Sequence, residues 1–87
     1  MTVTVYSTTY CGYCTRAEDL LRRKGIPFTR IDVTNDWRMR DQLVERSHGR
    51  RTVPVIFFDD EAIGGYRELA ALAMSGELDR RVAAEAA

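Results

Sequence analysis

The chain is poor in the side chains that usually hold a structural metal, because its 87 residues include only two cysteines and one histidine. A closed zinc site generally takes four cysteine or histidine ligands. The histidine, His48, lies far along the chain from Cys11 and Cys14, in a segment that we expect to be a loop. A zinc site within one chain would therefore need an unusual number of carboxylates, and we expect none.

The sequence also has no net charge, since Lys and Arg together number 13 and Asp and Glu together number 13. This balance gives no electrostatic argument for a nucleic-acid or membrane partner. The segment WRMR, residues 37–40, places an aromatic ring beside arginines, which is one pattern of nucleic-acid binding. In a neutral chain, a solvated helix face is the better interpretation. We therefore expect neither partner.

Long apolar runs are missing as well. None approaches the roughly 20 residues that a membrane-spanning helix needs, and the N-terminal MTVTVYSTTYC has neither the basic start nor the apolar core of a secretory signal. We therefore expect a cytoplasmic protein. In that compartment structural disulfides are rare, and a close cysteine pair is more often catalytic or metal-binding.

The composition, with 45% hydrophobic and 30% charged residues, is that of a folded globular protein. The length favours one domain over residues 1–87 with one modest core. β-Branched and aromatic runs predict strands at 2–7, 27–33 and 53–58, and a short strand at 62–63. Helical spacing and capping residues predict helices over 11–24, 36–46, 66–75 and 77–84, with Asn35 or Asp36 capping the second.

This order, β-α-β-α-β-β-α with a last short helix, predicts an α/β fold. The first two strands, separated by one helix, should pair in parallel. The strand at 62–63 follows a tight turn and should pair back antiparallel. The strand at 53–58 is the most apolar and should be central. We therefore expect a four-stranded mixed sheet with helices on both faces.

Both cysteines lie in the segment TYCGYC, at the start of the first predicted helix. Unpaired N–H groups and the positive end of the helix dipole at that place favour a thiolate, which is the nucleophilic form. Cys11 is then the candidate nucleophile, and Cys14 can attack the mixed disulfide that Cys11 forms. A Cys-X-X-Cys pair near a strand–helix–strand pattern indicates a thioredoxin-like redox site. A pair of inert core thiols is the alternative.

Five segments follow one another along the chain, which are VYSTTYCGYC, LLRRKGIPF, GRRTVPVIFFDD, AIGGYREL and SGELD. With these segments in this order, the chain resembles a dithiol glutaredoxin over nearly its whole length. The resemblance implies a thioredoxin-like fold, a single glutaredoxin domain, and glutathione-dependent reduction of protein disulfides and glutathione-mixed disulfides. The implied partners are glutathione and proteins that carry disulfides or bound glutathione.

The resemblance also implies a cis peptide bond between Val53 and Pro54 and a groove that binds glutathione. The residues that it assigns to this groove are Tyr13, Arg40, Thr52, Val53, Pro54, Gly65, Tyr66 and Arg67. Other interpretations stay open for some of them. Tyr13 can be an ordinary exposed aromatic, Arg40 can be one of several arginines on a solvated helix, and Gly65 can serve only the turn.

Three positions depart from the pattern of the family. Thr8 stands where many members have lysine, and Arg67 stands where an acidic residue often meets the amino end of glutathione, although Glu68 is a possible substitute. These two changes leave open another low-molecular-weight thiol or a flavoprotein reductase as the reductant. Gly12 replaces the usual proline, and such members can bridge a 2Fe–2S cluster through the first cysteine. We expect a monomer, and a dimer only with a cluster bound through Cys11.

Overall fold

The computed structural model describes residues 1–86, and its elements follow the predicted order. The strands are β1 (Val3–Ser7), β2 (Thr29–Asp32), β3 (Val55–Phe58) and β4 (Glu61–Gly64). The helices are α1 (Gly12–Arg23), α2 (Trp37–Arg46), α3 (Tyr66–Ser75) and α4 (Glu77–Ala86). Of the two candidate caps for α2, the structure uses Asp36, whose carboxylate accepts the Met39 N–H at 3.0 Å. No helix among these residues is both long and apolar enough to cross a bilayer.

The four strands form one mixed sheet in the order β2-β1-β3-β4. Strands β1 and β2 are parallel and β3 and β4 are antiparallel, as the sequence predicts. The structure adds that β1 and β3 are antiparallel. All four residues of β3 are buried. This burial and its interior place in the sheet confirm that the most apolar strand is central.

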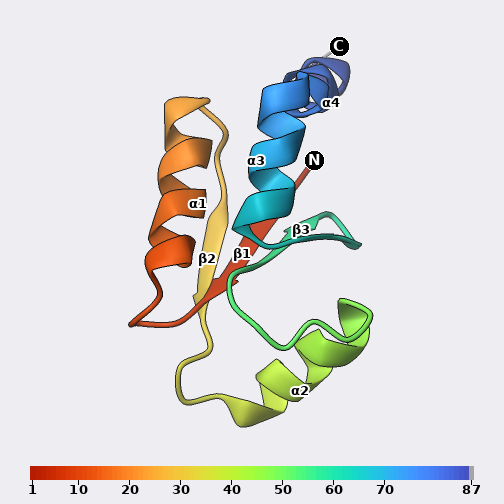
Figure 1. The fold of residues 1–87 in the computed structure, drawn as a ribbon. Helices are drawn as coiled ribbons and strands as arrows, with labels where there is room; N and C mark the ends of the chain where they lie inside the picture. The colour runs from red at the N-terminus through yellow and green to blue at the C-terminus, as the bar shows by residue number, and fades with distance from the viewer. Residues whose placement is uncertain (87) are drawn as a thin grey trace.

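Alternate residues of the inner strands pack against different helices, so the sheet is covered on both faces. Figure 1 shows α1 and α3 side by side on one face, with α2 apart from them. The core on the α1, α3 and α4 side contains Val3, Val5, Ala17, Leu21, Ile26, Ile56, Phe58, Leu69 and Leu78. The core on the α2 side contains Tyr6, Val33, Leu43, Val55 and Phe57. The predicted layers are therefore confirmed.

Two predicted strands begin two residues later in the structure than expected, and the part that is missing from each contains a proline. The second begins at Thr29 instead of at Pro27, and the third begins at Val55, after the cis Val53–Pro54 bond. Proline has no N–H to donate to a sheet ladder. Residues 53 and 54 are consequently free of the sheet and form a loop beside the start of α1.

Leu69 of α3 is completely buried in the core on the α1 side. Leu69→Ala should lower the free energy of unfolding by about 2–5 kcal/mol, because the removed side chain leaves a cavity. Urea denaturation followed by circular dichroism measures the change. Met74→Ala on the same helix is the matched control, since Met74 is 89% exposed, and its effect should be within about 0.5 kcal/mol. Equal effects of the two changes would contradict the placement of Leu69.

Candidate active site

The two cysteines lie at the first turn of α1 and are joined in a disulfide bond. Cys11 has an extended backbone and is the N-cap of the helix, and its sulfur accepts the Cys14 N–H at 3.1 Å. A sulfur atom thus occupies the place that a serine or aspartate oxygen takes in most helix caps. In the reduced protein the same N–H group and the helix dipole favour a thiolate at Cys11.

The two cysteines differ in their access to solvent. Cys14 is 1% exposed and packs into the protein, whereas Cys11 is only partly buried. A substrate sulfur can therefore approach Cys11 and not Cys14. This asymmetry supports the predicted division of roles, with Cys11 as nucleophile and Cys14 as the internal thiol that attacks the Cys11 mixed disulfide.

The loop before β3 brings backbone atoms to the cysteines. The Val53–Pro54 peptide bond is cis, as the resemblance implies, and the Val53 carbonyl oxygen lies 3.5 Å from Cys11 Sγ. Pro54, the next residue of this loop, is buried. An extended ligand linked to Cys11 would lie directly along this part of the backbone.

A hollow of about 360 Å³, here called the main groove, opens beside this loop. It is lined by Tyr13, Arg50, Thr52, Val53, Pro54, Gly65, Tyr66 and Arg67. All the residues that the resemblance assigns to glutathione are in this lining except Arg40. The Tyr13 and Tyr66 rings, 6.1 Å apart, form one wall. The Tyr13 side chain is 50% exposed, and it also lines the main groove.

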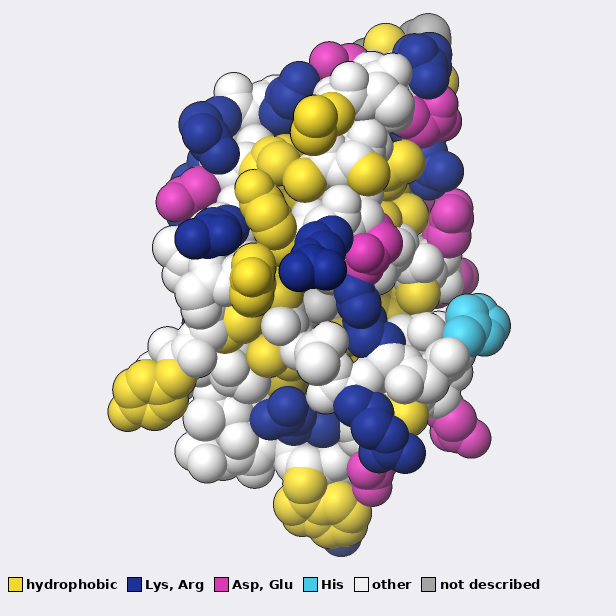
Figure 2. Space-filling model, in the orientation of Figure 1, with side chains coloured by type: hydrophobic (Ala, Val, Ile, Leu, Met, Phe, Trp, Pro, Cys, Tyr) yellow, Lys and Arg dark blue, Asp and Glu magenta, His cyan; other side chains and the backbone are white. Residues whose placement is uncertain are grey.

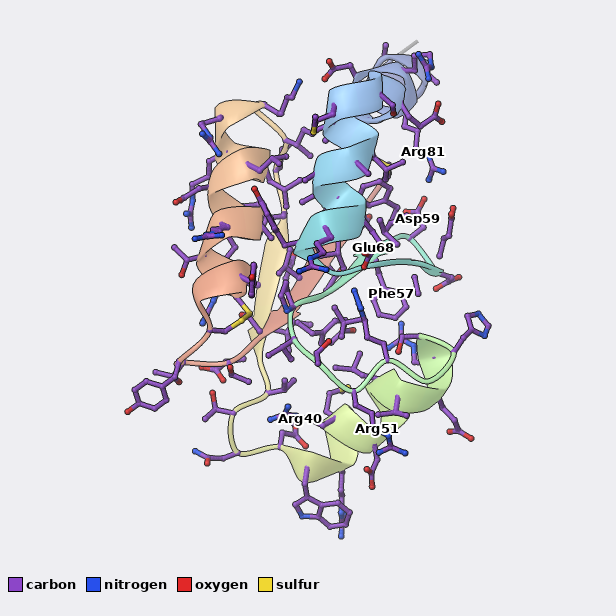
Figure 3. All side chains as sticks on the ribbon, in the orientation of Figure 1. Arg40, Arg51, Phe57, Asp59, Glu68 and Arg81 are labelled. Carbon is purple, nitrogen blue, oxygen red and sulfur yellow. A yellow bond between two sulfur atoms is a disulfide. The ribbon has the colours of Figure 1, made fainter. Side chains whose placement is uncertain are left out.

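A second, smaller hollow of about 160 Å³, here called the side pocket, contains Arg40. Its lining is Arg40, Asp41, Leu43, Val44, Arg50, Arg51, Thr52, Val53 and Val55. Because Arg50, Thr52 and Val53 line both hollows, the two are adjoining parts of one surface. Figure 3 shows Arg40 and Arg51 at the level of α2, away from Glu68 at the start of α3.

The sequence analysis missed Arg50 and Arg51. Their signal was the pair of arginines that directly precedes TVP, a segment already assigned to the ligand. Arg50 matters for both hollows because it lies between them. Arg51 adds a second guanidinium beside Arg40 in the side pocket.

Glu68 fixes the start of α3 at the edge of the main groove. Its carboxylate accepts the Gly65 N–H at 2.8 Å and pairs with the guanidinium of Arg50. The Gly65 hydrogen bond first, and then the charge of Arg50, hold the pKa of Glu68 below its usual value. Glu68 is therefore already engaged within the protein and is not a free partner for the amino group of a ligand.

The two glycines before α3 are needed for this arrangement. Gly64 has a φ of +123°, a backbone conformation that favours glycine. A Cβ atom at Gly65 would lie 2.7 Å from the Arg50 guanidinium and 3.3 Å from the Pro54 carbonyl oxygen. The double glycine lets the Arg50 side chain and the Pro54 loop approach the start of α3.

Gly12, between the cysteines, is exposed, and a Cβ atom built there would meet no described atom within 4 Å. Packing therefore does not require glycine at this place. Among the side chains that the structure describes, in residues 1–84, no group of three or more His, Cys, Asp or Glu is arranged to hold a metal ion.

Comparisons of the sequence give one consistent family. A family model described as Glutaredoxin matches residues 3–63. Glutaredoxin 3 of Escherichia coli is 42% identical over 77 residues, which cover 88% of this chain and 92% of that protein. A glutaredoxin of Pseudomonas aeruginosa is 38% identical over 82 residues, which cover 94% of this chain and 96% of that protein.

Solved structures agree with the sequence matches. The holo form of glutaredoxin C1 from Populus tremula x tremuloides superposes with a TM-score of 0.87 at 32% identity, covering 98% of this chain and 78% of that one. A buckwheat glutaredoxin–glutathione complex gives a TM-score of 0.84 at 30% identity, covering 90% of this chain and 73% of that one. The mixed sheet with its flanking helices is therefore the thioredoxin-like fold of these proteins.

The lowered pKa of Glu68 predicts a pH-dependent contribution to stability. A carboxylate whose folded-state pKa is depressed stabilises the protein above its unfolded pKa, near 4.5, and loses this contribution as the pH falls through the folded pKa. Glu68→Gln should therefore destabilise the protein at pH 7, by at most about 1 kcal/mol because the side chain is 43% exposed. Below about pH 4.5 the difference from wild type should shrink.

Urea denaturation of wild type and Glu68→Gln between about pH 3 and pH 7 measures this difference. Arg50→Gln should give only part of the effect, because the Gly65 N–H is the larger cause of the pKa shift. A stability difference that stays constant over the whole range would show that Glu68 does not act through its charge.

Proposed function

The chain belongs to the glutaredoxin family and is a thiol-disulfide oxidoreductase, and we propose that glutathione is the thiol that it uses. The observation that carries this proposal is the main groove, which adjoins the partly exposed Cys11 through Val53 and continues into the arginine-rich side pocket. A glutathione linked to Cys11 has carboxylates at both ends, and arginines lie in both hollows. The complex of the buckwheat relative with glutathione supports the same assignment.

The proposed first step is attack on a glutathione-mixed disulfide. The Cys11 thiolate forms a bond to the glutathione sulfur, the original S–S bond breaks, and the substrate sulfur leaves with the electron pair and takes a proton. The Cys14 N–H that contacts Cys11 Sγ stabilises the thiolate before attack. The main groove holds the glutathione half in place, so the attached protein needs few contacts of its own.

Two routes then restore the enzyme. A second glutathione thiolate can attack the glutathione sulfur bound to Cys11, which gives glutathione disulfide and a free Cys11 thiolate. With a protein disulfide as substrate, Cys11 first bonds to one substrate sulfur while the other leaves as a thiol. Cys14 then attacks Cys11, the Cys11–substrate S–S bond breaks, the second substrate sulfur leaves with the electron pair and takes a proton, and the Cys11–Cys14 disulfide present in this structure forms. Two glutathione molecules supply the two electrons that reduce this disulfide.

This cycle needs a pool of reduced thiols, which the cytoplasm provides. We therefore place the protein in the cytoplasm. Each step uses side chains of one chain, so the reductase reaction requires only a monomer.

A second candidate function is binding of a 2Fe–2S cluster, which the open space around Gly12 and the partly exposed Cys11 favour. Such a cluster takes four thiolate ligands, and one chain offers a single accessible cysteine. The residues therefore fit only a dimer in which each chain supplies Cys11 and two glutathione thiolates complete the set. Visible absorbance and a dimer by size-exclusion chromatography after anaerobic reconstitution would support it. A colourless monomer would rule it out.

Substitution of each cysteine separates the proposed routes. Cys11→Ser should abolish turnover with both a glutathionylated peptide and a protein disulfide, because no nucleophile remains. Cys14→Ser should keep turnover with the glutathionylated peptide, which needs only one protein thiol, and lose turnover with the protein disulfide. The measurement is NADPH consumption coupled through glutathione reductase. Turnover that persists in Cys11→Ser, or is lost for both substrates in Cys14→Ser, would contradict the assigned roles.

A further inference from the structure

We propose that the main groove recognises its thiol ligand by carboxylates and not by an amino group, with Arg67 as the residue that sets this preference. This inference rests on the proposed use of glutathione, which carries two carboxylates and one α-ammonium group. It predicts that an analogue of glutathione without the amino group reacts at least as fast as glutathione itself.

The charges around the main groove are the first argument. Its charged lining residues are Arg50 and Arg67, and no carboxylate belongs to the described lining. Figure 2 shows basic side chains gathered on this face from the start of α3 down to α2. The wall formed by Gly65, Tyr66 and Arg67 is also the N-terminal end of α3, whose first N–H groups have no partner within the helix. This end of the groove attracts anions and repels cations.

The nearest acidic side chain does not change this balance. Glu68 is bound by Arg50 and by the Gly65 N–H, and its charge offsets that of Arg50. Arg67, by contrast, is exposed and has no ion-pair partner among the described residues. The uncompensated charge at this end of the groove is therefore positive.

The sizes of the two hollows indicate which arm of glutathione lies where. The γ-glutamyl arm is longer than the glycine arm, and the main groove, at about 360 Å³, is larger than the side pocket, at about 160 Å³. The glycine carboxylate then lies near Arg40 and Arg51. The α-carboxylate and α-ammonium groups share one carbon atom, so binding the carboxylate at Arg67 also brings the ammonium group close to this guanidinium.

The expected size of the effect follows from the exposure of Arg67. Two unit charges about 4 Å apart in water interact strongly enough to change a rate constant about five-fold, and salt reduces this effect. We therefore expect a change of about three- to ten-fold when the charge at residue 67 is reversed.

Among the described residues that line the two hollows, Asp41 is the one with a carboxylate. It belongs to α2, directly after Arg40, and lines the side pocket together with that residue. If glutathione bound in the opposite direction, its ammonium group would meet Asp41, and the amino group would be recognised. Asp41 therefore serves as the internal test of the proposed direction.

The experiment compares two mixed disulfides of the same fluorescent peptide. One carries glutathione, and the other carries the analogue in which a glutaryl group replaces the γ-glutamyl group, so that only the amino group is lost. Reduced Cys14→Ser protein is mixed with each substrate in a stopped-flow instrument, and release of the peptide thiol gives the second-order rate constant of the first step. The measured quantity is the ratio of the glutathione rate to the analogue rate.

In the Cys14→Ser background this ratio should be one or less. Adding Arg67→Asp should raise it about three- to ten-fold, and Arg67→Gln should give an intermediate value. The differences should diminish as the salt concentration rises. An aspartate in the first turn suits the start of α3, so the variant should remain folded, which circular dichroism checks.

Three results would each overturn the inference alone. The ratio of the glutathione rate to the analogue rate could be well above one before Arg67 is changed, or Arg67→Asp could leave it unchanged. The third such result is a ratio that Asp41→Asn lowers. A different result would overturn the proposed function as well. A mixed disulfide of cysteamine, which has no carboxylate, is the control substrate. If it reacted as fast as both others, the groove would recognise neither form of glutathione.

Discussion

The structure of the active site depends on one contact, in which the sulfur of Cys11 caps the first turn of α1 by accepting the Cys14 N–H. This contact makes the reactive atom part of the helix end, so the helix dipole and free N–H groups act on it directly. It also separates the two cysteines by function, because the next helical turn carries Cys14 into the core. The rest of the fold holds α1 in this position through Ala17 and Leu21, both completely buried against the sheet.

A second constraint joins the groove to the core. The Arg50–Glu68 ion pair and the Gly65–Glu68 hydrogen bond connect the loop after α2 with the start of α3. Both elements line the main groove, and neither belongs to the strands that form the sheet. The close packing at Gly65 keeps this connection short. One side chain, Glu68, thus sets the relative position of two walls of the groove, and in doing so it is withdrawn from any direct role with a ligand.

The distribution of charge follows from the same arrangement. The chain as a whole is neutral, but several of its acidic side chains pair with arginines or lysines away from the groove, as Asp19 does with Arg22 and Asp79 with Lys24. The arginines around the groove have fewer such partners. A neutral protein therefore presents a locally basic surface beside its reactive cysteine, which suits a thiol with carboxylates at both ends.

The sequence by itself determined the elements, the layers and the redox pair, because these depend on local patterns. The apolar run VIFF, the capping residues of the helices and the Cys-X-X-Cys spacing each act within a few residues. The tertiary structure decided the rest. It placed Arg40 in the side pocket, placed Arg50 between the two hollows, and paired Glu68 with Arg50. These outcomes could not be predicted because they join residues far apart in the chain, and only the packing of α2, α3 and the Pro54 loop determines which side chains meet.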